Sequence, residues 1–224
     1  MSGPRKPPAL LLFDLDGTLI DSAPDLAGAA NDLRAAHGLP PLPYAALRPM
    51  VGSGARGMVG VAFGVTPTDA RFADLRDAFL ARYAQRLLHS TRVFDAMQPV
   101  LDRLDAAGQR WGIVTNKAMR FTQPLVEGLG LAARAAVVIA GDTTPFAKPH
   151  PEPLLEAARR VGVAPAHCAY VGDDQRDVQA GRAAGMATLA AAWGYLGLGE
   201  PVAAWGADQV LSSPAALLQW LDLA

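Results

Sequence analysis

The stretch Leu11-Leu12-Phe13-Asp14-Leu15-Asp16-Gly17-Thr18 places two carboxylates one residue apart at the end of an apolar run. An unpaired carboxylate in an apolar interior costs several kcal/mol or takes up a proton, and two together cost more. Residues two apart in an extended segment point to the same side. We therefore predict that Asp14 and Asp16 face one edge of a buried strand, where a positively charged group compensates them.

Short apolar runs alternate with longer helical patterns after about residue 95, which is typical of β-α-β units and a parallel sheet. The predicted strands are residues 9–13, 111–114, 136–140, 169–171, 187–191 and 209–211. The predicted helices are residues 99–107, 120–129, 153–161 and 177–184, each followed directly by a glycine. Glycine is a common helix terminator. The pattern indicates an α/β fold with a doubly wound parallel sheet.

Residues 24–92 show a different pattern, because amphipathic segments such as 25–36 and 69–88 follow one another with no convincing strand between them. This helical segment comes directly after the first predicted strand. The simplest architecture is an α/β core that is interrupted by a helical cap. We expect the core to comprise residues 1–22 and 96–224, and the cap domain to comprise residues 23–95.

The composition favours a globular protein that binds a small ligand. The chain has 224 residues, of which 51% are hydrophobic, and a net charge of −1, so nothing electrostatic favours a nucleic acid or an acidic membrane as partner. The apolar run 9–13 behind Arg5 and Lys6 is too short for a signal peptide, and no segment is long enough for a membrane anchor. The single cysteine, Cys168, fits a buried thiol. We expect a cytoplasmic protein, and the oligomeric state is open.

Polar side chains follow several of the predicted strands, where ligands bind in open α/β sheets. They are Asp14, Asp16, Thr115, Asn116, Lys148, Asp173, Asp174 and Asp177. Asp14, Asp16 and Asp173 would form an anionic, oxygen-rich pocket that suits Mg²⁺, and the lack of a Cys or His cluster argues against zinc. Lys148 supplies a second positive charge.

Some of these residues have a plain structural alternative. Asp177 and Asp174 stand where a helix begins, so either carboxylate could serve as a helix cap. Thr115 and Asn116, taken alone, are as consistent with a structural role as with ligand binding. For Asp14 and Asp16 the structural reading is weak, because no local basic residue is available to pair with them.

Four motifs resemble, in order and spacing, those of the haloacid dehalogenase superfamily. They are Asp14-Leu15-Asp16-Gly17-Thr18-Leu19, Val114-Thr115-Asn116-Lys117, Lys148-Pro149-His150-Pro151 and Gly172-Asp173-Asp174-Gln175-Arg176-Asp177. The resemblance extends over nearly the whole chain, and it is to the phosphoglycolate phosphatase branch, whose helical cap is inserted after the first motif. It implies a Rossmann-like core and Mg²⁺-dependent hydrolysis of a small phosphorylated metabolite.

The resemblance also implies roles for individual residues in catalysis. Asp14 would attack the phosphoryl group to form an aspartyl-phosphate, and Asp16 would act as general acid and then general base. Thr115 and Asn116 would donate hydrogen bonds to phosphoryl oxygens, and Lys148 would stabilise the negative charge.

The same resemblance implies the ligands of the Mg²⁺ ion. The Asp14 side chain, the Asp16 main-chain carbonyl and Asp173 would hold the ion, with Asp177 in a supporting position. The presence of Asp16 argues against a dehalogenase, because those relatives lack this second acid. A sugar phosphomutase would share all four motifs, and a non-catalytic phosphate-binding protein is a further alternative.

The cap carries the features that would set substrate specificity. The stretch 52–57 reads GxGxxG, but it follows no strand and is therefore a poor dinucleotide-binding motif. It fits a glycine-rich cap loop that brings Arg56 to a substrate carboxylate, with a solvated arginine as the alternative. The resemblance places 2-phosphoglycolate first as substrate, because phosphoglycolate phosphatases cover the broader branch. N-acetylmuramic acid 6-phosphate is the alternative, because Asp174 departs from the phosphoglycolate phosphatase pattern.

Overall fold

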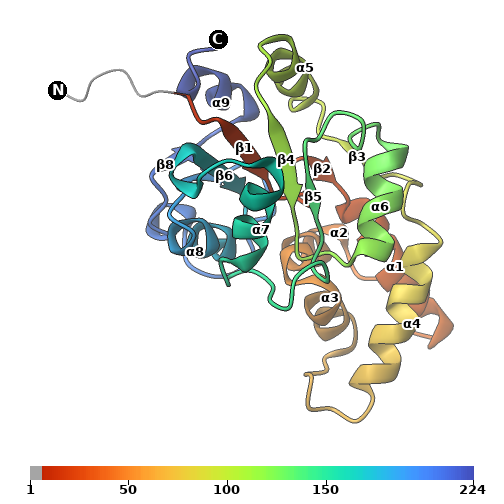
Figure 1. Ribbon diagram of the computed structural model, residues 1–224. Coiled ribbons are helices and arrows are strands. Elements are labelled where there is room, and N and C mark those ends of the chain that lie inside the picture. Colours follow the sequence, from red (N-terminus) through yellow and green to blue (C-terminus); the bar gives the residue numbers. More distant parts are fainter. Residues whose placement is uncertain (1–6) are drawn as a thin grey trace.

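A parallel sheet of six strands forms the centre of the computed structural model, which describes residues 7–224 (Figure 1). Arg5 and Lys6 lie outside the described residues. The strand order is β5-β4-β1-β6-β7-β8. The bounds are β1 (Leu10–Phe13), β4 (Trp111–Val114), β5 (Val138–Ile139), β6 (Cys168–Gly172), β7 (Ala187–Ala191) and β8 (Gln209–Leu211). The predicted doubly wound α/β fold is confirmed.

Strand β1 lies in the middle of this sheet and is completely buried. It pairs in parallel with β4 on one side, where Leu11 lies opposite Trp111, and with β6 on the other. Leu11 and Phe13 belong to the apolar cluster on one face of the sheet, and Leu10 and Leu12 belong to the cluster on the opposite face. This burial on both faces explains why the run is continuously apolar.

Five helices cover the two faces of the sheet. Their bounds are α5 (Gln98–Ala106), α6 (Met119–Gly128), α7 (Glu152–Val161), α8 (Gln175–Ala183) and α9 (Pro214–Trp220). Apolar residues of α5, α6 and α9 share a cluster with Leu11 and Phe13, whereas those of α7 and α8 share a cluster with Leu10 and Leu12. The four predicted helices begin and end within two residues of their observed bounds. Helix α9 was not predicted.

A second group of helices follows β1 and has an apolar cluster of its own. These helices are α1 (Ala23–Ala36), α2 (Tyr44–Leu47), the 3₁₀ helix η1 (Arg48–Ser53), α3 (Gly54–Phe63) and α4 (Phe72–Ala84). Two further short 3₁₀ helices, η2 (Pro165–His167) and η3 (Val202–Ala204), lie elsewhere in the chain. Residues 23–95 are called the cap segment below, and their exact boundaries as a domain stay a prediction.

The chain enters and leaves the cap segment through a small antiparallel ribbon that the sequence did not predict. Strand β2 (Ile20–Asp21) pairs with β3 (Arg92–Val93). Buried Asp25 of α1 fixes the adjoining segment, because its carboxylate accepts hydrogen bonds of 2.8 Å from the main-chain N–H groups of Ser90 and Thr91. Within residues 7–224, no helix has the length and apolar character needed to cross a membrane.

Candidate active site

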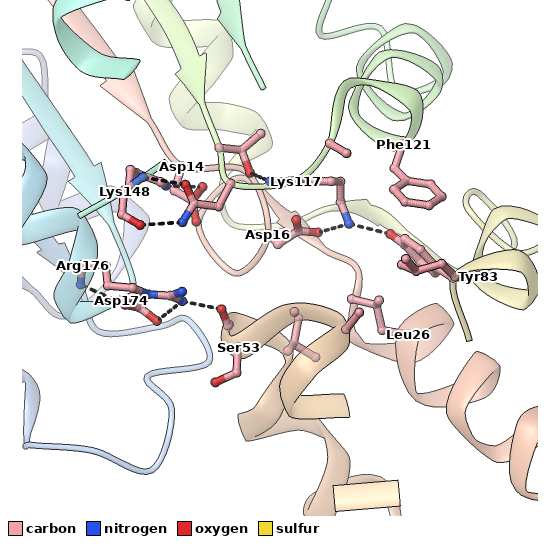
Figure 2. Close-up of a pocket in the computed structure, with 18 of the residues that line it drawn as sticks. Asp14, Asp16, Leu26, Ser53, Tyr83, Lys117, Phe121, Lys148, Asp174 and Arg176 are labelled. Atoms are coloured by element: carbon pink, nitrogen blue, oxygen red, sulfur yellow. Dashed lines mark hydrogen bonds and ion pairs between the residues drawn. The ribbon is translucent and has the colours of Figure 1, made fainter. Parts of the chain in front are cut away.

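A cavity of about 330 Å³ lies between the carboxyl ends of the central strands and the cap segment (Figure 2). The strand ends contribute the floor, which consists of Asp14, Asp16, Thr115, Asn116, Lys117, Lys148 and Asp173. The cap segment contributes the wall, which consists of Leu26, Val51, Gly52, Ser53, Gly54, Ala55, Phe79, Leu80 and Tyr83. A charged floor opposite a largely apolar wall is typical of a site for a small polar molecule.

Asp14 and Lys148 form the ion pair at the base of the floor. Asp14 directly follows β1, and its Oδ1 lies 2.8 Å from the Nζ of Lys148. The same Nζ lies 2.7 Å from Asp177 Oδ1 in α8. Lys148 is 5% exposed. Burial opposes the charge on this lysine, but Asp14 and Asp177 outweigh burial and raise its pKa, so the side chain stays an ammonium.

Two side chains hold Lys148 in this position. Its Nζ donates hydrogen bonds to the hydroxyl of buried Tyr170, at 2.6 Å, and to the carbonyl of Val114, at 3.1 Å. The Asn116 amide forms a reciprocal pair with the main chain of Lys148, with both distances at 2.9 Å. The side chain of Asn116 thus fixes the loop that carries the lysine, and since Asn116 also lines the cavity, its role in phosphate binding stays a prediction. The contact of Tyr170 with Lys148 was not predicted, because a tyrosine in a buried strand is expected to pack in the core.

Asp173 follows β6 and is held on both of its oxygens. Its Oδ1 accepts a hydrogen bond of 2.8 Å from Thr18 Oγ1, and its Oδ2 accepts one of 2.8 Å from the main-chain N–H of Tyr195. Gly17, at φ +86°, lies so close that a Cβ there would stand 2.2 Å from Asp173 Oδ2. Gly194 approaches from the other side, with a built Cβ 2.2 Å from Asp173 Cβ. The two glycines therefore let two loops close tightly around the carboxylate.

Tyr195 connects this acid to the start of the cap segment. Its hydroxyl accepts hydrogen bonds from the main-chain N–H groups of Ser22 and Ala23, at 2.9 and 3.0 Å. Tyr195 is buried, and its polar atoms join the loop after β7 to the segment that enters α1.

Three carboxylates on the floor could hold a metal ion. One oxygen from each of Asp14, Asp173 and Asp177 lies within 4.8 Å of the other two. Burial raises the pKa of Asp14 to about 6, despite the opposing charge of Lys148. Burial, together with the neighbouring Asp14 and Asp177, raises the pKa of Asp173 well above its usual range. A bound divalent cation would relieve this excess of buried negative charge, so the donor set fits a cation that prefers oxygen ligands.

Asp177 has two structural roles besides its place in this cluster. Its Oδ1 pairs with Lys148, and its Oδ2 accepts a hydrogen bond of 3.0 Å from the main-chain N–H of Asp174. The Asp174 side chain in turn caps the start of α8. Asp174 and Asp177 therefore form the helix cap that was the structural alternative for them. Asp177 also lies beside Asp14 in the group of three carboxylates.

Asp16 lies apart from the three carboxylates and meets a second lysine. Its Oδ1 lies 3.2 Å from Lys117 Nζ and accepts a hydrogen bond from the Ser22 hydroxyl. The Lys117 ammonium also donates a hydrogen bond of 2.8 Å to the Tyr83 hydroxyl in α4 (Figure 2). Burial alone would lower the pKa of Lys117, but Asp16 and Tyr83 raise it. Lys117 belongs to the second motif, but no role was predicted for it from the sequence. Nothing in the sequence predicted that Tyr83 would lie at this site.

Another contact between floor and cap involves Arg176. Its guanidinium pairs with the Asp174 carboxylate at 2.8 Å and donates a hydrogen bond to the carbonyl of Gly52 in the cap segment. Burial opposes ionisation of Asp174, but the hydrogen bonds and charge of Arg176 lower its pKa. Arg176, in helix α8 of the core, thus contacts the cap segment directly.

Thr115 and Arg56 have different positions relative to the cavity. Thr115 is 3% exposed on the floor, and its hydroxyl accepts a hydrogen bond of 3.2 Å from the N–H of Lys117. The side chain of Arg56 is exposed on α3, and Arg56 is not among the residues that line the cavity, although Gly54 and Ala55 are. The structure therefore brings the predicted floor residues together but does not bring Arg56 to them.

Comparison with known proteins agrees with the motifs. A model of the haloacid dehalogenase-like hydrolases matches residues 8–185. A phosphoglycolate phosphatase of Xanthomonas campestris pv. campestris (strain 8004) is 48% identical over 94% of this chain and 95% of its own length. An N-acetylmuramic acid 6-phosphate phosphatase of Pseudomonas aeruginosa (strain PAO1) is 41% identical over 96% of this chain and 95% of its own length.

Solved structures show the same architecture. A crystal structure described as a predicted phosphoglycolate phosphatase from Haemophilus somnus 129PT superposes with a TM-score of 0.83 at 28% sequence identity, over 95% of this chain and 97% of that one. The family model spans most of the present chain, and the four motifs meet around one cavity. The protein belongs to the haloacid dehalogenase-like hydrolases.

Proposed function

We propose that this hydrolase is a Mg²⁺-dependent phosphatase that cleaves a small phosphomonoester through an aspartyl-phosphate on Asp14, with 2-phosphoglycolate as the first candidate substrate. The observation that carries the proposal is the Asp14 carboxylate, which is oriented by Lys148 at 2.8 Å on the floor of the cavity. The phosphoglycolate phosphatase relative at 48% identity supports the choice of substrate. We further propose a cytoplasmic location, since the single cysteine is a free buried thiol.

The first chemical step transfers the phosphoryl group to the protein. A carboxylate oxygen of Asp14 forms a bond to phosphorus while the bond from phosphorus to the ester oxygen breaks. Asp16, in its protonated form, gives its proton to the departing alkoxide. The Lys148 ammonium faces the charge that builds up on the phosphoryl oxygens, and the buried Thr115 hydroxyl donates a hydrogen bond to one of them.

The second step releases phosphate and restores the acid. Asp16, now a carboxylate, takes a proton from water as the water oxygen bonds to phosphorus and the bond to Asp14 breaks. Lys117, 3.2 Å from Asp16 Oδ1, orients this carboxylate in both steps. The Asp16 side chain lies outside the group of three carboxylates that could hold the metal ion, so it is available for proton transfer.

Asp14 and Asp173 would hold the Mg²⁺ ion, assisted by the Asp16 main-chain carbonyl, with Asp177 in support. Bound Mg²⁺ supplies positive charge that offsets the repulsion between the phosphate and these carboxylates. Asp177 is suited to the supporting position because both of its oxygens already accept contacts, from Lys148 and from the Asp174 N–H. Burial and the neighbouring carboxylates, which together raise the pKa of Asp14 and Asp173, support a cation at this place.

N-acetylmuramic acid 6-phosphate is the second candidate substrate, and the size of the cavity favours it. A volume of about 330 Å³ lies at the lower end of pockets that hold drug-sized molecules, roughly 300–1,000 Å³. A two-carbon acid would leave much of the apolar wall uncovered. The relative from Pseudomonas aeruginosa carries this activity in its name.

The test is release of inorganic phosphate from both esters, side by side, with Mg²⁺ and with a chelator. We expect release that depends on Mg²⁺ and that falls at least ~10³-fold in Asp14→Asn, because the nucleophile is lost. Turnover retained in that variant would exclude Asp14 as the nucleophile. An isomerised sugar phosphate without free phosphate would establish a mutase, and ester binding without turnover would establish a phosphate-binding protein.

A further inference from the structure

Four basic side chains line the cavity, and three of them are already paired with carboxylates. Lys148 lies 2.8 Å from Asp14, Lys117 lies 3.2 Å from Asp16, and Arg176 lies 2.8 Å from Asp174. The fourth is Arg120, in the first turn of α6. Within residues 7–224 no carboxylate lies within 4.0 Å of its guanidinium, and the group is exposed. Among the four basic side chains of the described residues that line the cavity, Arg120 is thus the one whose charge is available to a ligand.

Arg120 also stands where the cavity adjoins a second hollow. An outer groove of about 470 Å³ lies between α4 and α6, lined by Asp77, Leu80, Ala81, Ala84, Arg120 and Phe121. Leu80, Arg120 and Phe121 line both hollows, whereas Asp14 and Lys148 line only the inner cavity. Figure 2 shows Phe121 and Tyr83 on the opposite side of Lys117 from Asp14 and Lys148. A ligand that has its phosphate at Asp14 would extend past Lys117 toward Phe121, and the Arg120 guanidinium lies over the Phe121 ring.

The immediate surroundings of Arg120 suit a carboxylate. Its guanidinium carbon lies 4.6 Å from the centre of the Phe121 ring, and this contact with the ring positions the planar group. A guanidinium binds a carboxylate through two parallel hydrogen bonds, which fixes orientation as well as charge. The apolar neighbours Leu80 and Phe121 would cover uncharged parts of the same ligand.

We propose that Arg120 is a specificity-determining residue that binds a carboxylate on the substrate at the end remote from the phosphate. This proposal rests on the phosphatase activity proposed above. Of the two candidate substrates above, it favours N-acetylmuramic acid 6-phosphate, a phosphorylated sugar acid in which a ring separates the two charged groups. In a two-carbon acid the carboxylate stays next to the phosphate, near the floor, where Lys117 and Lys148 are already paired.

The experiment compares two esters that differ by the carboxylate arm. One is N-acetylmuramic acid 6-phosphate, and the other is the same sugar phosphate without its lactyl ether, N-acetylglucosamine 6-phosphate. Arg120→Gln and the wild type are assayed on both. The matched control is Arg160→Gln, which removes an exposed arginine of α7 that lines neither hollow.

We expect Arg120→Gln to lower kcat/KM for the carboxylate-bearing ester by about 10- to 100-fold, mainly through KM, since hydrogen bonds between charged groups contribute about 1.5–3 kcal/mol. For the ester without the lactyl group the change should stay within about twofold. For the carboxylate-bearing ester, kcat/KM of Arg120→Lys should lie between the values of the wild type and Arg120→Gln. Lysine keeps the charge but cannot form the two parallel hydrogen bonds. Arg160→Gln should match the wild type on both esters.

Three results would overturn the proposal. An equal loss of kcat/KM on both sugar esters in Arg120→Gln would mean that Arg120 has a structural role. No loss on either ester would mean that Arg120 does not contact the substrate. A wild-type preference for 2-phosphoglycolate over both sugar esters would exclude the proposed substrate class. In each case the wild type still releases phosphate, so these results differ from failure of the proposed function, in which the wild type hydrolyses none of the three esters.

Discussion

The floor and the wall of the cavity are built on different principles. Floor side chains stand at the ends of buried strands, and each charge among Asp14, Asp16, Lys117 and Lys148 has a partner of opposite sign. The wall comes from helices with their own apolar cluster and offers mainly aliphatic and aromatic surface. In the function that we propose, the floor carries the chemistry and the wall selects the organic part of the substrate.

Polar contacts across the cavity join the two regions. Lys117 links Asp16 to Tyr83, and Arg176 links Asp174 to Gly52. Both contacts start from a carboxylate of the core and end on the cap segment. The position of the cap segment is therefore coupled to Asp16, which we assign to proton transfer, and to Asp174, which caps the start of α8.

The largest effect should follow from removing a floor charge. Lys148→Met should lower kcat by about 10²-fold or more, because a positive group facing the phosphoryl oxygens is lost. The variant also leaves Asp14 and Asp177 without their buried counter-ion, so we expect the free energy of unfolding to fall by about 3–5 kcal/mol. Phosphate-release kinetics and urea denaturation measure the two effects. A kcat near that of the wild type would reduce Lys148 to a structural counter-ion.

A smaller effect should follow at the contact between floor and wall. Tyr83→Phe removes the hydroxyl that accepts from Lys117 at 2.8 Å but keeps the ring that packs on Phe79 and Phe121. We expect kcat to fall about 3- to 10-fold with little change in KM, because Asp16 is held less firmly. The control is Tyr44→Phe on the exposed surface of the cap segment. A change confined to KM would mean that Tyr83 only shapes the wall.

The smallest effect should come from the cap arginine that the sequence singled out. Arg56 is exposed and lines neither hollow, so Arg56→Gln should change kcat/KM for each of the three esters by less than about twofold. Steady-state kinetics beside Arg120→Gln would compare the two arginines directly. A selective loss on carboxylate-bearing esters in Arg56→Gln would mean that the cap segment moves during binding and brings this residue inward.

Much of the core was predictable because its signals are local. A continuously apolar run that ends in Asp14 and Asp16 marks a buried strand, and polar residues after later strands must share its edge of the sheet. The structure places Asp14, Thr115, Lys148 and Asp173 around one cavity as this reasoning requires. The cap segment was predicted only as a series of helices, since amphipathic spacing does not say which residues of a helix line a cavity and which face solvent.

The contacts that the sequence did not predict are long-range. The Asn116 side chain pairs with the main chain of Lys148, and the Tyr170 hydroxyl contacts the same lysine. Arg56 and Arg120 are both arginines near helix starts, and nothing in their neighbouring residues predicts which one lines a cavity. Their exposure and contacts depend on how the cap segment packs against α6.

The hydrophobic pattern and the residues after each predicted strand were sufficient to predict the charged floor, and the resemblance of the four motifs to the haloacid dehalogenase superfamily implied the reaction class. The partner of each charge, the links through Tyr83 and Arg176, and the unpaired charge of Arg120 required the folded chain. The physical reason is that ion pairing and cavity shape depend on atoms brought within a few ångströms from distant parts of the sequence. A linear pattern records which groups are present, and packing decides which of them are already neutralised and which remain available to a substrate.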